Sequence, residues 1–361
     1  MTPLENMLSL YRRTGYECAP VGFSLCPAMQ QKMHAAVPDG MSLGEYFDYP
    51  EGFARAGAPG PKRIPREEPD WRAFFPDDLH ESTTFSDYGM AQERGHEGTH
   101  HLFRMHHPMA QFDSLEQMEA YPWPEWDWDD TVHMTAAVED AHARDLPVVA
   151  GMACCVWETS WYIRDMTVLM MDMVMGEEKA AYVLDRVTED SARRAAAFAR
   201  AGVDIIATGD DIGMQETIMM SVEMYREWLK PRLARIIGAA KAIKPDILIQ
   251  YHSCGYVEPF IPELMEAGVD ILNPVQPECM DFAKLHAEYG DVLSFNGTLG
   301  TQTTMPWGSE QDVRDLVFRN LGIAGEKGGL MVCPTHLLEP EVPWGNVEAY
   351  VNACRDYSRG D

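Results

Sequence analysis

The feature that most constrains this chain is an alternation of short apolar runs with longer amphipathic stretches, from about residue 130 onward. The apolar runs, which predict β-strands, are 147–152, 203–208, 247–251, 270–273, 293–296 and 330–333. The amphipathic stretches, which predict α-helices, are 131–143, 179–201, 222–243, 257–267, 282–288 and 310–324. Gly202, Gly268 and Gly290 each stand just before an apolar run, where glycine commonly ends a helix. Repeated helix–strand units of this kind require a parallel sheet.

A closed barrel is favoured over an open sheet, because no glycine-rich nucleotide loop follows any of these runs. Residues 21–25 supply one further strand, and Pro27 opens the helix that follows it, since proline suits the first turn of a helix. The eighth strand is expected in the N-terminal third. A barrel of this type takes about 250 residues plus insertions. We therefore predict an α/β fold, a (β/α)8 TIM barrel, with residues 1–361 as a single domain.

Residues 39–128 interrupt the alternation and are predicted to form an irregular insertion over the barrel mouth. They are rich in proline, glycine and aromatic residues, as in YPWPEW at 121–126. This aromatic cluster fits either a lid or the packing of the insertion against the barrel. The histidine doublets at 100–101 and 106–107 are interpreted as structural or surface residues, because adjacent residues of a strand point to opposite faces.

The formal net charge of -28 argues against nucleic-acid and anionic-membrane partners, because such a surface repels phosphate groups. The N-terminal residues lack a basic region followed by an apolar stretch, and no run approaches the roughly 18 apolar residues of a membrane span. The 8 cysteines are therefore interpreted as thiols of a cytoplasmic protein, some of which bind metal. The sequence leaves a monomer and a homodimer open.

A group of soft metal ligands is predicted at the carboxyl ends of two strands. His252 and Cys254 lie two residues apart at the end of the run 247–251, so their side chains point the same way. Cys333 ends the run 330–333, and in a parallel barrel it faces the same mouth. Three protein ligands with an open fourth position are typical of catalytic zinc, whereas structural zinc is usually closed by four. The alternative is that these cysteines are small buried apolar residues.

Charged and polar residues at other strand ends are further candidates, because active sites of such barrels lie at the carboxyl ends of the strands. Asp210 and Asp211 follow the run 203–208 and either orient substrate, support a zinc ligand or cap a helix turn. Glu158 is a candidate fourth ligand or proton donor, with a surface glutamate as the alternative. His336 is a candidate catalytic residue, because it lies three residues after Cys333.

Amide side chains at the same edge are expected to contact the substrate. Asn273, Gln276 and Asn296 occupy such positions, at or just after the runs 270–273 and 293–296. Gln276 is also a candidate fourth metal ligand in the resting state.

Several segments, in their order and spacing, resemble the uroporphyrinogen decarboxylase superfamily. They are GDDIG at 209–213, MYRE at 224–227, KPR at 230–232, HSCG at 252–255, EAGVDILNPVQ at 266–276 and PTH at 334–336. The resemblance covers most of the chain from about residue 107 to the end. It implies an α/β barrel, in agreement with the strand pattern, and membership of one of two branches: porphyrinogen decarboxylases or cobalamin-dependent methyltransferases.

The methyltransferase branch carries an H-x-C…C zinc motif, which His252, Cys254 and Cys333 match residue by residue. The decarboxylases resemble one another in an R-Q-A-G-R-Y segment, and YRRTGY at 11–16 lacks its second half. A decarboxylase must also hold a substrate with many carboxylates, which a net charge of -28 opposes. This chain has no D-x-H-x-x-G corrinoid-binding pattern, so the resemblance implies a corrinoid carried by a separate protein.

These residues and this resemblance together predict a zinc-dependent methyltransferase. It would move a methyl group between a corrinoid partner protein and a small molecule, either a methylated substrate such as a methoxy compound or a thiol acceptor. Its cofactors would be Zn²⁺ and a methylcobalamin-type corrinoid supplied by the partner. The zinc ion would hold a substrate thiol as thiolate or polarise an ether oxygen. The alternatives are a metal-independent decarboxylase with Asp210 or Asp211 as polar anchor, and a non-catalytic tetrapyrrole-binding barrel.

Overall fold

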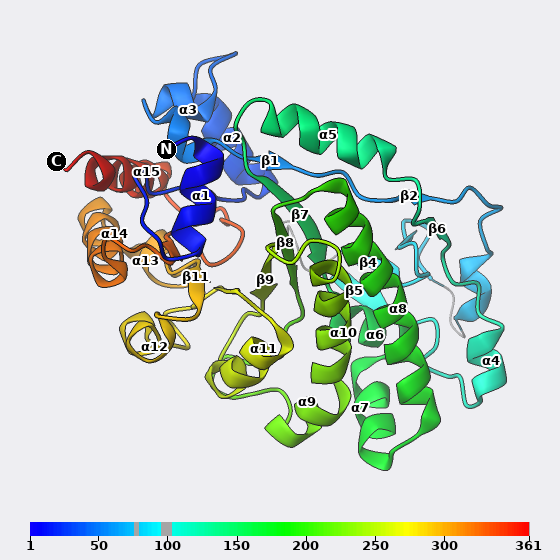
Figure 1. Cartoon of the computed structure of the whole chain (residues 1–361). Coiled ribbons are helices and arrows are strands. Elements are labelled where there is room, and N and C mark those ends of the chain that lie inside the picture. The colour runs from blue at the N-terminus through cyan, green and yellow to red at the C-terminus, as the bar shows by residue number, and fades with distance from the viewer. Residues whose placement is uncertain (76–78, 95–102, 361) are drawn as a thin grey trace.

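The computed structural model of the chain describes residues 1–75, 79–94 and 103–360. Its centre is a curled parallel sheet of 7 strands in the order β1-β7-β8-β9-β10-β11-β12 (Figure 1). The strands are β1 (Ala56–Gly57), β7 (Val148–Ala153), β8 (Ile205–Gly209), β9 (Leu248–His252), β10 (Ile271–Asn273), β11 (Ser294–Asn296) and β12 (Leu330–Met331). The six strands from β7 to β12 lie within one or two residues of the predicted runs. The arrangement confirms the predicted TIM-barrel-like α/β fold.

The eighth position of the barrel differs from the prediction. Residues 21–25 do not form a regular strand. Among the described residues, their pairing is limited to an isolated parallel bridge between Leu25 and Leu338. The reason lies at Gly22, whose backbone N–H donates to the Tyr350 hydroxyl at 3.0 Å, so this segment binds a helix instead of a strand. The strand that pairs with β7 is β1, which belongs to the barrel although it lies within the predicted insertion.

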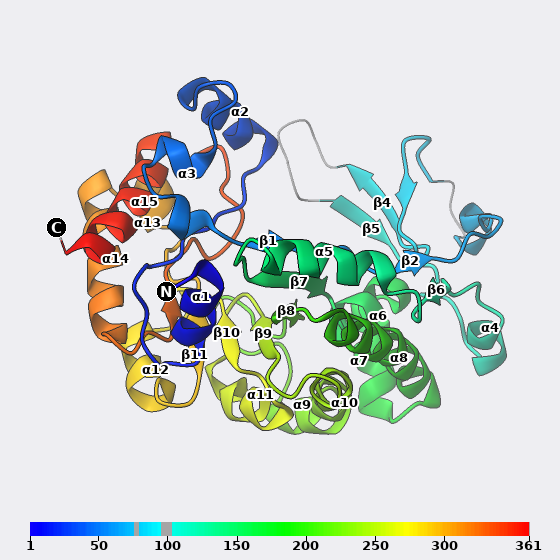
Figure 2. The ribbon, with the colours of Figure 1, turned by 45° about the horizontal axis from the view of Figure 1, so that its top comes forward.

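Helices surround the sheet on its outer side (Figure 2). They include α2 (Pro27–Ala36), α5 (Val132–His142), α8 (Glu178–Ala201), α11 (Ile261–Ala267), α12 (Phe282–Tyr289), α14 (Glu310–Ala324) and α15 (Trp344–Arg359). The helix predicted at 222–243 is divided into α9 (Val222–Trp228) and α10 (Lys230–Lys241). Pro231 stands in the first turn of α10 and has no backbone N–H to continue the preceding helix. No helix of the described residues is both long and apolar enough to cross a bilayer.

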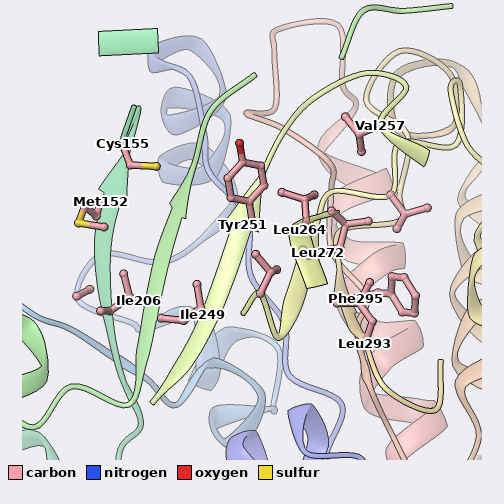
Figure 3. Close-up of a cluster of buried hydrophobic side chains, with 14 of the residues drawn as sticks. Met152, Cys155, Ile206, Ile249, Tyr251, Val257, Leu264, Leu272, Leu293 and Phe295 are labelled. Carbon is pink, nitrogen blue, oxygen red and sulfur yellow. The ribbon is translucent and has the colours of Figure 1, made fainter. Parts of the chain in front are cut away.

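Alternation along the strands gives the barrel an apolar outer layer and an inner face that is apolar at the amino ends of the strands and polar at their carboxyl ends. Ile206, Ile249, Tyr251, Leu272 and Phe295 pack with the surrounding helices in the main hydrophobic core (Figure 3). The residues between them point inward, because successive side chains of a strand face opposite sides. The inward set therefore contains the polar ends of the strands.

Helix α1 (Pro3–Tyr11) closes the amino end of the barrel. Its residues Met7, Leu10 and Tyr11 form a separate buried cluster with inward residues of the strands, among them Ile205 and Ile271. Thr2 begins the helix with a capping box, in which its side chain accepts from the Glu5 backbone N–H. The N-terminal segment is thus fixed at the base of the interior cavity.

The part of the insertion from residue 71 onward lies mainly against α6 (Trp157–Arg164) and α8. Its described part contains η2 (Trp71–Phe74), β2 (Lys62–Arg63) paired with β6 (Trp126–Asp127), and α4 (Leu115–Glu119). It also contains the three-stranded sheet of β3 (Thr84–Phe85), β4 (Ala91–Arg94) and β5 (Phe103–His106). The buried aromatic residues Trp71, Tyr121 and Trp123 pack with Ile163 and Val183, so packing against the barrel accounts for the aromatic cluster. The doublet at 100–101 lies outside the described residues, whereas His107 Nδ1 contacts the Tyr162 carbonyl oxygen at 2.9 Å, as a structural residue does.

Candidate functional site

The end of β9 brings an imidazole and a thiol together. His252 is the last residue of β9 and points inward, and Cys254 follows in the loop. His252 Nε2 lies 3.5 Å from Cys254 Sγ. Two ligands of one tetrahedral zinc ion, with Zn–N and Zn–S bonds of about 2.05 and 2.3 Å, are about 3.5 Å apart. The observed separation therefore fits a pair of ligands to one ion.

The other ring nitrogen of His252 has a fixed partner. His252 Nδ1 lies 2.7 Å from Asn273 Oδ1, and an amide oxygen can only accept, so Nδ1 carries the proton. This leaves the lone pair of Nε2 directed toward Cys254. Asn273 Nδ2 in turn donates to the backbone oxygen of Asn296 at 2.9 Å and to its Oδ1 at 3.1 Å. Asn273 and Asn296 were predicted to contact substrate, and the structure joins them to the imidazole.

Asp211 is the third member of this group. Asp211, His252 and Cys254 offer ligand atoms that all lie within 4.8 Å of one another. Asp211 Oδ1 lies 3.7 Å from His252 Nε2 and accepts the Cys254 backbone N–H at 2.8 Å. The carboxylate therefore fixes the backbone of the loop that carries the thiol, as well as facing the imidazole.

Cys333 shares the interior cavity with His252 but lies outside that close group. Its Sγ donates to Asn296 Oδ1 at 3.0 Å. Asn296 thus links Cys333 to Asn273 and, through it, to His252. Burial raises the pKa of the Cys333 thiol to about 12, an effect that the positive charge of Arg55 opposes. Burial also raises the pKa of Cys254 to about 12, reinforced by the nearby Asp211.

A glycine at the end of β8 permits this arrangement. Gly209 has φ +152°, and a Cβ at this position would lie 2.1 Å from the backbone oxygen of His252. The next residue, Asp210, donates its backbone N–H to the same oxygen at 3.0 Å. Only a residue without a side chain lets β8 approach the end of β9 this closely.

Glu158 joins the group from the first turn of α6. Its Oε2 accepts the Asp211 backbone N–H at 3.0 Å, and its Oε1 accepts the Tyr162 hydroxyl at 2.7 Å. Burial, followed by the charge of Asp211, raises the pKa of Glu158 above its ordinary value. These contacts join Glu158 to Asp211, while its role as fourth ligand or proton donor stays a prediction.

Asp210 has a different environment from Asp211. It is 2% exposed, and its carboxylate accepts the backbone N–H groups of Val156 at 3.0 Å and Glu158 at 2.9 Å. It therefore caps the N-terminus of α6 from the neighbouring strand. Burial, followed by the charge of Glu158, raises its pKa to about 7. Asp210 is not among the described residues that line the cavities at the mouth.

Two neighbouring cavities lie at this end of the barrel. The first, of about 530 Å³, extends from α1 to the strand ends and is lined by residues that include His252, Asn273, Asn296 and Cys333. The second, of about 380 Å³, is lined by Cys254 and Gln276, among others. His336 is exposed and lines both. Gln276 Oε1 accepts the Gly255 backbone N–H at 3.0 Å, so this amide supports the loop that carries Cys254.

Four residues of the site were not identified from the sequence. The Tyr11 hydroxyl and Gln250 Oε1 each accept from Asn296 Nδ2 at 2.9 Å. Tyr162 contacts Glu158, and Arg55 lines the larger cavity. Gln250 gave a usable signal, since it is the one polar residue in the apolar run 247–251, apart from the tyrosine. The other three lie in segments without any local pattern that points to the site.

The chain is similar to one protein family in sequence and to a methyltransferase in fold. The family model for uroporphyrinogen decarboxylase (URO-D) matches residues 96–357. A methyltransferase from Methanosarcina mazei has a similar fold, with a TM-score of 0.67, 18% sequence identity and 99% of each chain covered. A psychrophilic glycoside hydrolase family 10 endo-beta-1,4-xylanase aligns with a TM-score of only 0.38 and 12% identity, over 63% of this chain and 82% of its own. No protein with a curated description matches the chain.

Proposed function

The chain belongs to the uroporphyrinogen decarboxylase (URO-D) family, and we propose that it is a zinc-dependent methyltransferase that exchanges a methyl group with a corrinoid partner protein. The observation that carries the proposal is the 3.5 Å separation of His252 Nε2 and Cys254 Sγ, with Nδ1 held by Asn273. The structural match to the methyltransferase from Methanosarcina mazei, which covers 99% of each chain, supports the choice of reaction.

His252, Cys254 and Cys333 are the proposed protein ligands, with Asp211 beside His252 and Cys254. When bound, the zinc ion would hold a substrate thiol as thiolate or polarise an ether oxygen, which are ordinary roles of a Lewis-acidic ion. A carboxylate or amide beside a metal-binding imidazole fixes its tautomer and orientation. Asn273 fills that role for His252. Cys333 would exchange its contact with Asn296 Oδ1 for the ion, so Asn296 holds the thiol in place beforehand.

The reaction is a transfer of methyl between a heteroatom and cobalt. In demethylation the carbon–heteroatom bond would break with both bonding electrons left on the heteroatom, and the partner's corrinoid, when bound, would supply the electron pair that accepts the methyl group. The heteroatom would then take up a proton, and we propose Glu158 as its source, because Glu158 contacts the Asp211 backbone and its pKa is raised by burial and then by the charge of Asp211. Delivery of methyl to a thiol is the same transfer in reverse, with the thiol losing its proton.

A decarboxylase receives less support. Among the described residues that line the two cavities, Arg55 is the only lysine or arginine, whereas a substrate with many carboxylates calls for several cations. Of the two predicted polar anchors, Asp210 is engaged in capping α6 and Asp211 accepts the Cys254 backbone N–H. We therefore retain the methyltransferase as the proposed function.

The test is zinc stoichiometry together with methyl transfer. We expect one zinc ion per chain in the wild type, and its loss in both Cys254→Ala and Cys333→Ala with the fold retained. Cys354→Ala is the control, because Cys354 is a buried thiol like Cys333 but lies on α15 and lines neither cavity. Stoichiometric zinc in both site variants would remove the ligand assignment. Zinc-loaded protein that transfers no methyl between methylcobalamin and any thiol or methoxy compound would remove the reaction.

A further inference from the structure

Arg55 directs a positive charge into the larger cavity. It precedes β1, is solvent-accessible, and lines the cavity together with His252 and Cys333. Its charge acts against the burial that raises the pKa of both Tyr11 and Cys333, which places the guanidinium within electrostatic reach of both side chains. Arg55 is thus an exposed residue whose side chain lines the larger cavity.

The guanidinium has unused hydrogen-bonding capacity. Nη1 donates to the Val21 carbonyl oxygen at 2.6 Å, which fixes one side of the planar group. Within the described part of the chain, no carboxylate forms an ion pair with Arg55. An arginine carries five N–H donors in a fork that matches carboxylate and sulfonate oxygens. Its remaining donors are therefore free to bind an anion that enters the cavity.

The charge of the cavity contrasts with that of the whole protein. The chain has 57 acidic and 29 basic residues, and a net charge of -28. The residues that line the larger cavity nevertheless include no aspartate or glutamate. They include Arg55 and the two imidazoles of His252 and His336. In a protein with so many carboxylates, a lining of this kind favours an anionic ligand and leaves no carboxylate there to repel it.

Gly22 provides the space that the guanidinium occupies. A Cβ at this position would lie 2.3 Å from Arg55 Nη2 and 2.8 Å from Nη1. The backbone of Gly22 is not in the left-handed region, so alanine is compatible with it. An alanine here would displace the flexible end of Arg55 without straining the chain. A substitution at Gly22 can thus move the positive charge of Arg55 without removing it.

We propose that Arg55 binds the anionic group, a carboxylate or sulfonate, of the small molecule whose methyl group is transferred at the site. Arg55 thereby determines specificity, because it selects a charged donor or acceptor over a neutral one of the same shape. The part of this inference that names the ligand as a methyl donor or acceptor rests on the proposed function. The preference of the cavity for an anion rests on Arg55 and the lining alone.

The experiment compares ligands that differ only in charge. Binding of para-methoxybenzoate and para-methoxybenzamide, and of mercaptopropionate and mercaptopropionamide, is measured by calorimetry on the purified protein, with and without added zinc. Mercaptopropanesulfonate, compared with mercaptopropionate, distinguishes a sulfonate site from a carboxylate site. The variants are Arg55→Gln and Gly22→Ala. The control is Arg12→Gln, which removes the same charge from an exposed arginine whose partner is Asp246.

We expect wild type and Arg12→Gln to bind the anionic member at least about tenfold more tightly, since a hydrogen bond to a charged group contributes that much or more. Arg55→Gln should reduce this preference to within about twofold, and Gly22→Ala should reduce it partly. A preference that is absent in the wild type, or that survives in Arg55→Gln, overturns the inference. Zinc content and methyl transfer are measured on the same preparations. If both fail while the Arg55-dependent preference persists, the proposed function is wrong and the anion site stands.

Discussion

The amide of Asn273 offers the sharpest test of how the site is organised. Asn273→Ala removes the Oδ1 atom that lies 2.7 Å from His252 Nδ1. It also removes the donor of the 2.9 and 3.1 Å bonds to Asn296. The imidazole then loses the partner that fixes its tautomer and ring orientation, and Nε2 no longer has to face Cys254. The variant leaves all proposed zinc ligands in the chain.

The expected loss can be stated for two quantities. Mutation of the hydrogen-bond partner of a metal-ligating histidine typically lowers metal affinity by about 10- to 100-fold, which corresponds to about 1.4 to 2.8 kcal/mol. The free energy of unfolding should fall by about 1 to 2 kcal/mol, because Asn296 loses its donor in a half-buried position. We therefore expect zinc affinity to decrease through loss of the contact with His252, and fold stability to decrease through loss of the bonds to Asn296.

The assay is a competition for zinc against a chromophoric chelator at neutral pH, with urea unfolding measured in parallel. Asn346→Ala is the matched control, since Asn346 is 2% exposed and its Nδ2 donates to Met305 and Gly308 carbonyl oxygens at 2.8 Å, away from the cavities. We expect a comparable loss of stability there with zinc affinity unchanged. If Asn273→Ala binds zinc within twofold of the wild type, or if Asn346→Ala weakens zinc equally, the role assigned to Asn273 is refuted.

Two further predictions concern the fold around the site. Gly209→Ala should lower the free energy of unfolding by at least ~2 kcal/mol, because its Cβ would lie 2.1 Å from the His252 backbone. Gly151→Ala is the control: nothing lies within 4 Å of its Cβ, so it should be nearly neutral in thermal unfolding. Equal effects of the two substitutions would contradict the argument that β8 approaches β9 too closely for a side chain. Glu263 is buried between Arg226 and Lys230, whose hydrogen bonds lower its pKa to about 2. Because the folded pKa lies below the ordinary value of a glutamate, this stabilisation is complete above about pH 5 and is lost as the pH falls toward 2. The difference in urea stability between wild type and Glu263→Gln should therefore be larger at pH 6 than at pH 3, and a difference that does not change with pH would contradict the assignment.

The sequence was sufficient to predict the repeating part of the barrel. Helix α14 has the predicted bounds of 310–324, and β9 follows the predicted run within one residue. Both signals are local, since the apolar period and the capping residues lie within the element itself. The division of 222–243 into two helices was missed although its cause, Pro231, is visible in the sequence. A proline in the first turn of a helix and one in its interior give the same amphipathic pattern.

The parts that the sequence did not predict depend on contacts between distant segments. Strand β1 has two residues, too few for a periodic pattern, and is defined only by its pairing with β7. Residues 21–25 have the composition of a strand, but Tyr350 binds the backbone of Gly22. Tyr11 and Arg55 enter the barrel from an N-terminal helix and from an irregular segment. The proximity of His252 and Cys254 could be predicted from their spacing in the sequence, because both lie at the end of β9.

The side chains behind the Nδ1 atom of His252 are neutral, and this affects which small molecule the cavity can bind. Carboxylates commonly orient metal-bound imidazoles, yet here Asn273, Asn296, Gln250 and the Tyr11 hydroxyl fill the interior around His252. An amide fixes the tautomer of the imidazole as a carboxylate does, but it adds no negative charge. A carboxylate in this position would oppose the charge of Arg55 and repel an anionic substrate. The amide network and the arginine are therefore two parts of one electrostatic arrangement, in which the acidic side chains nearest the ligands, Asp211 and Glu158, are kept outside the lining of the larger cavity.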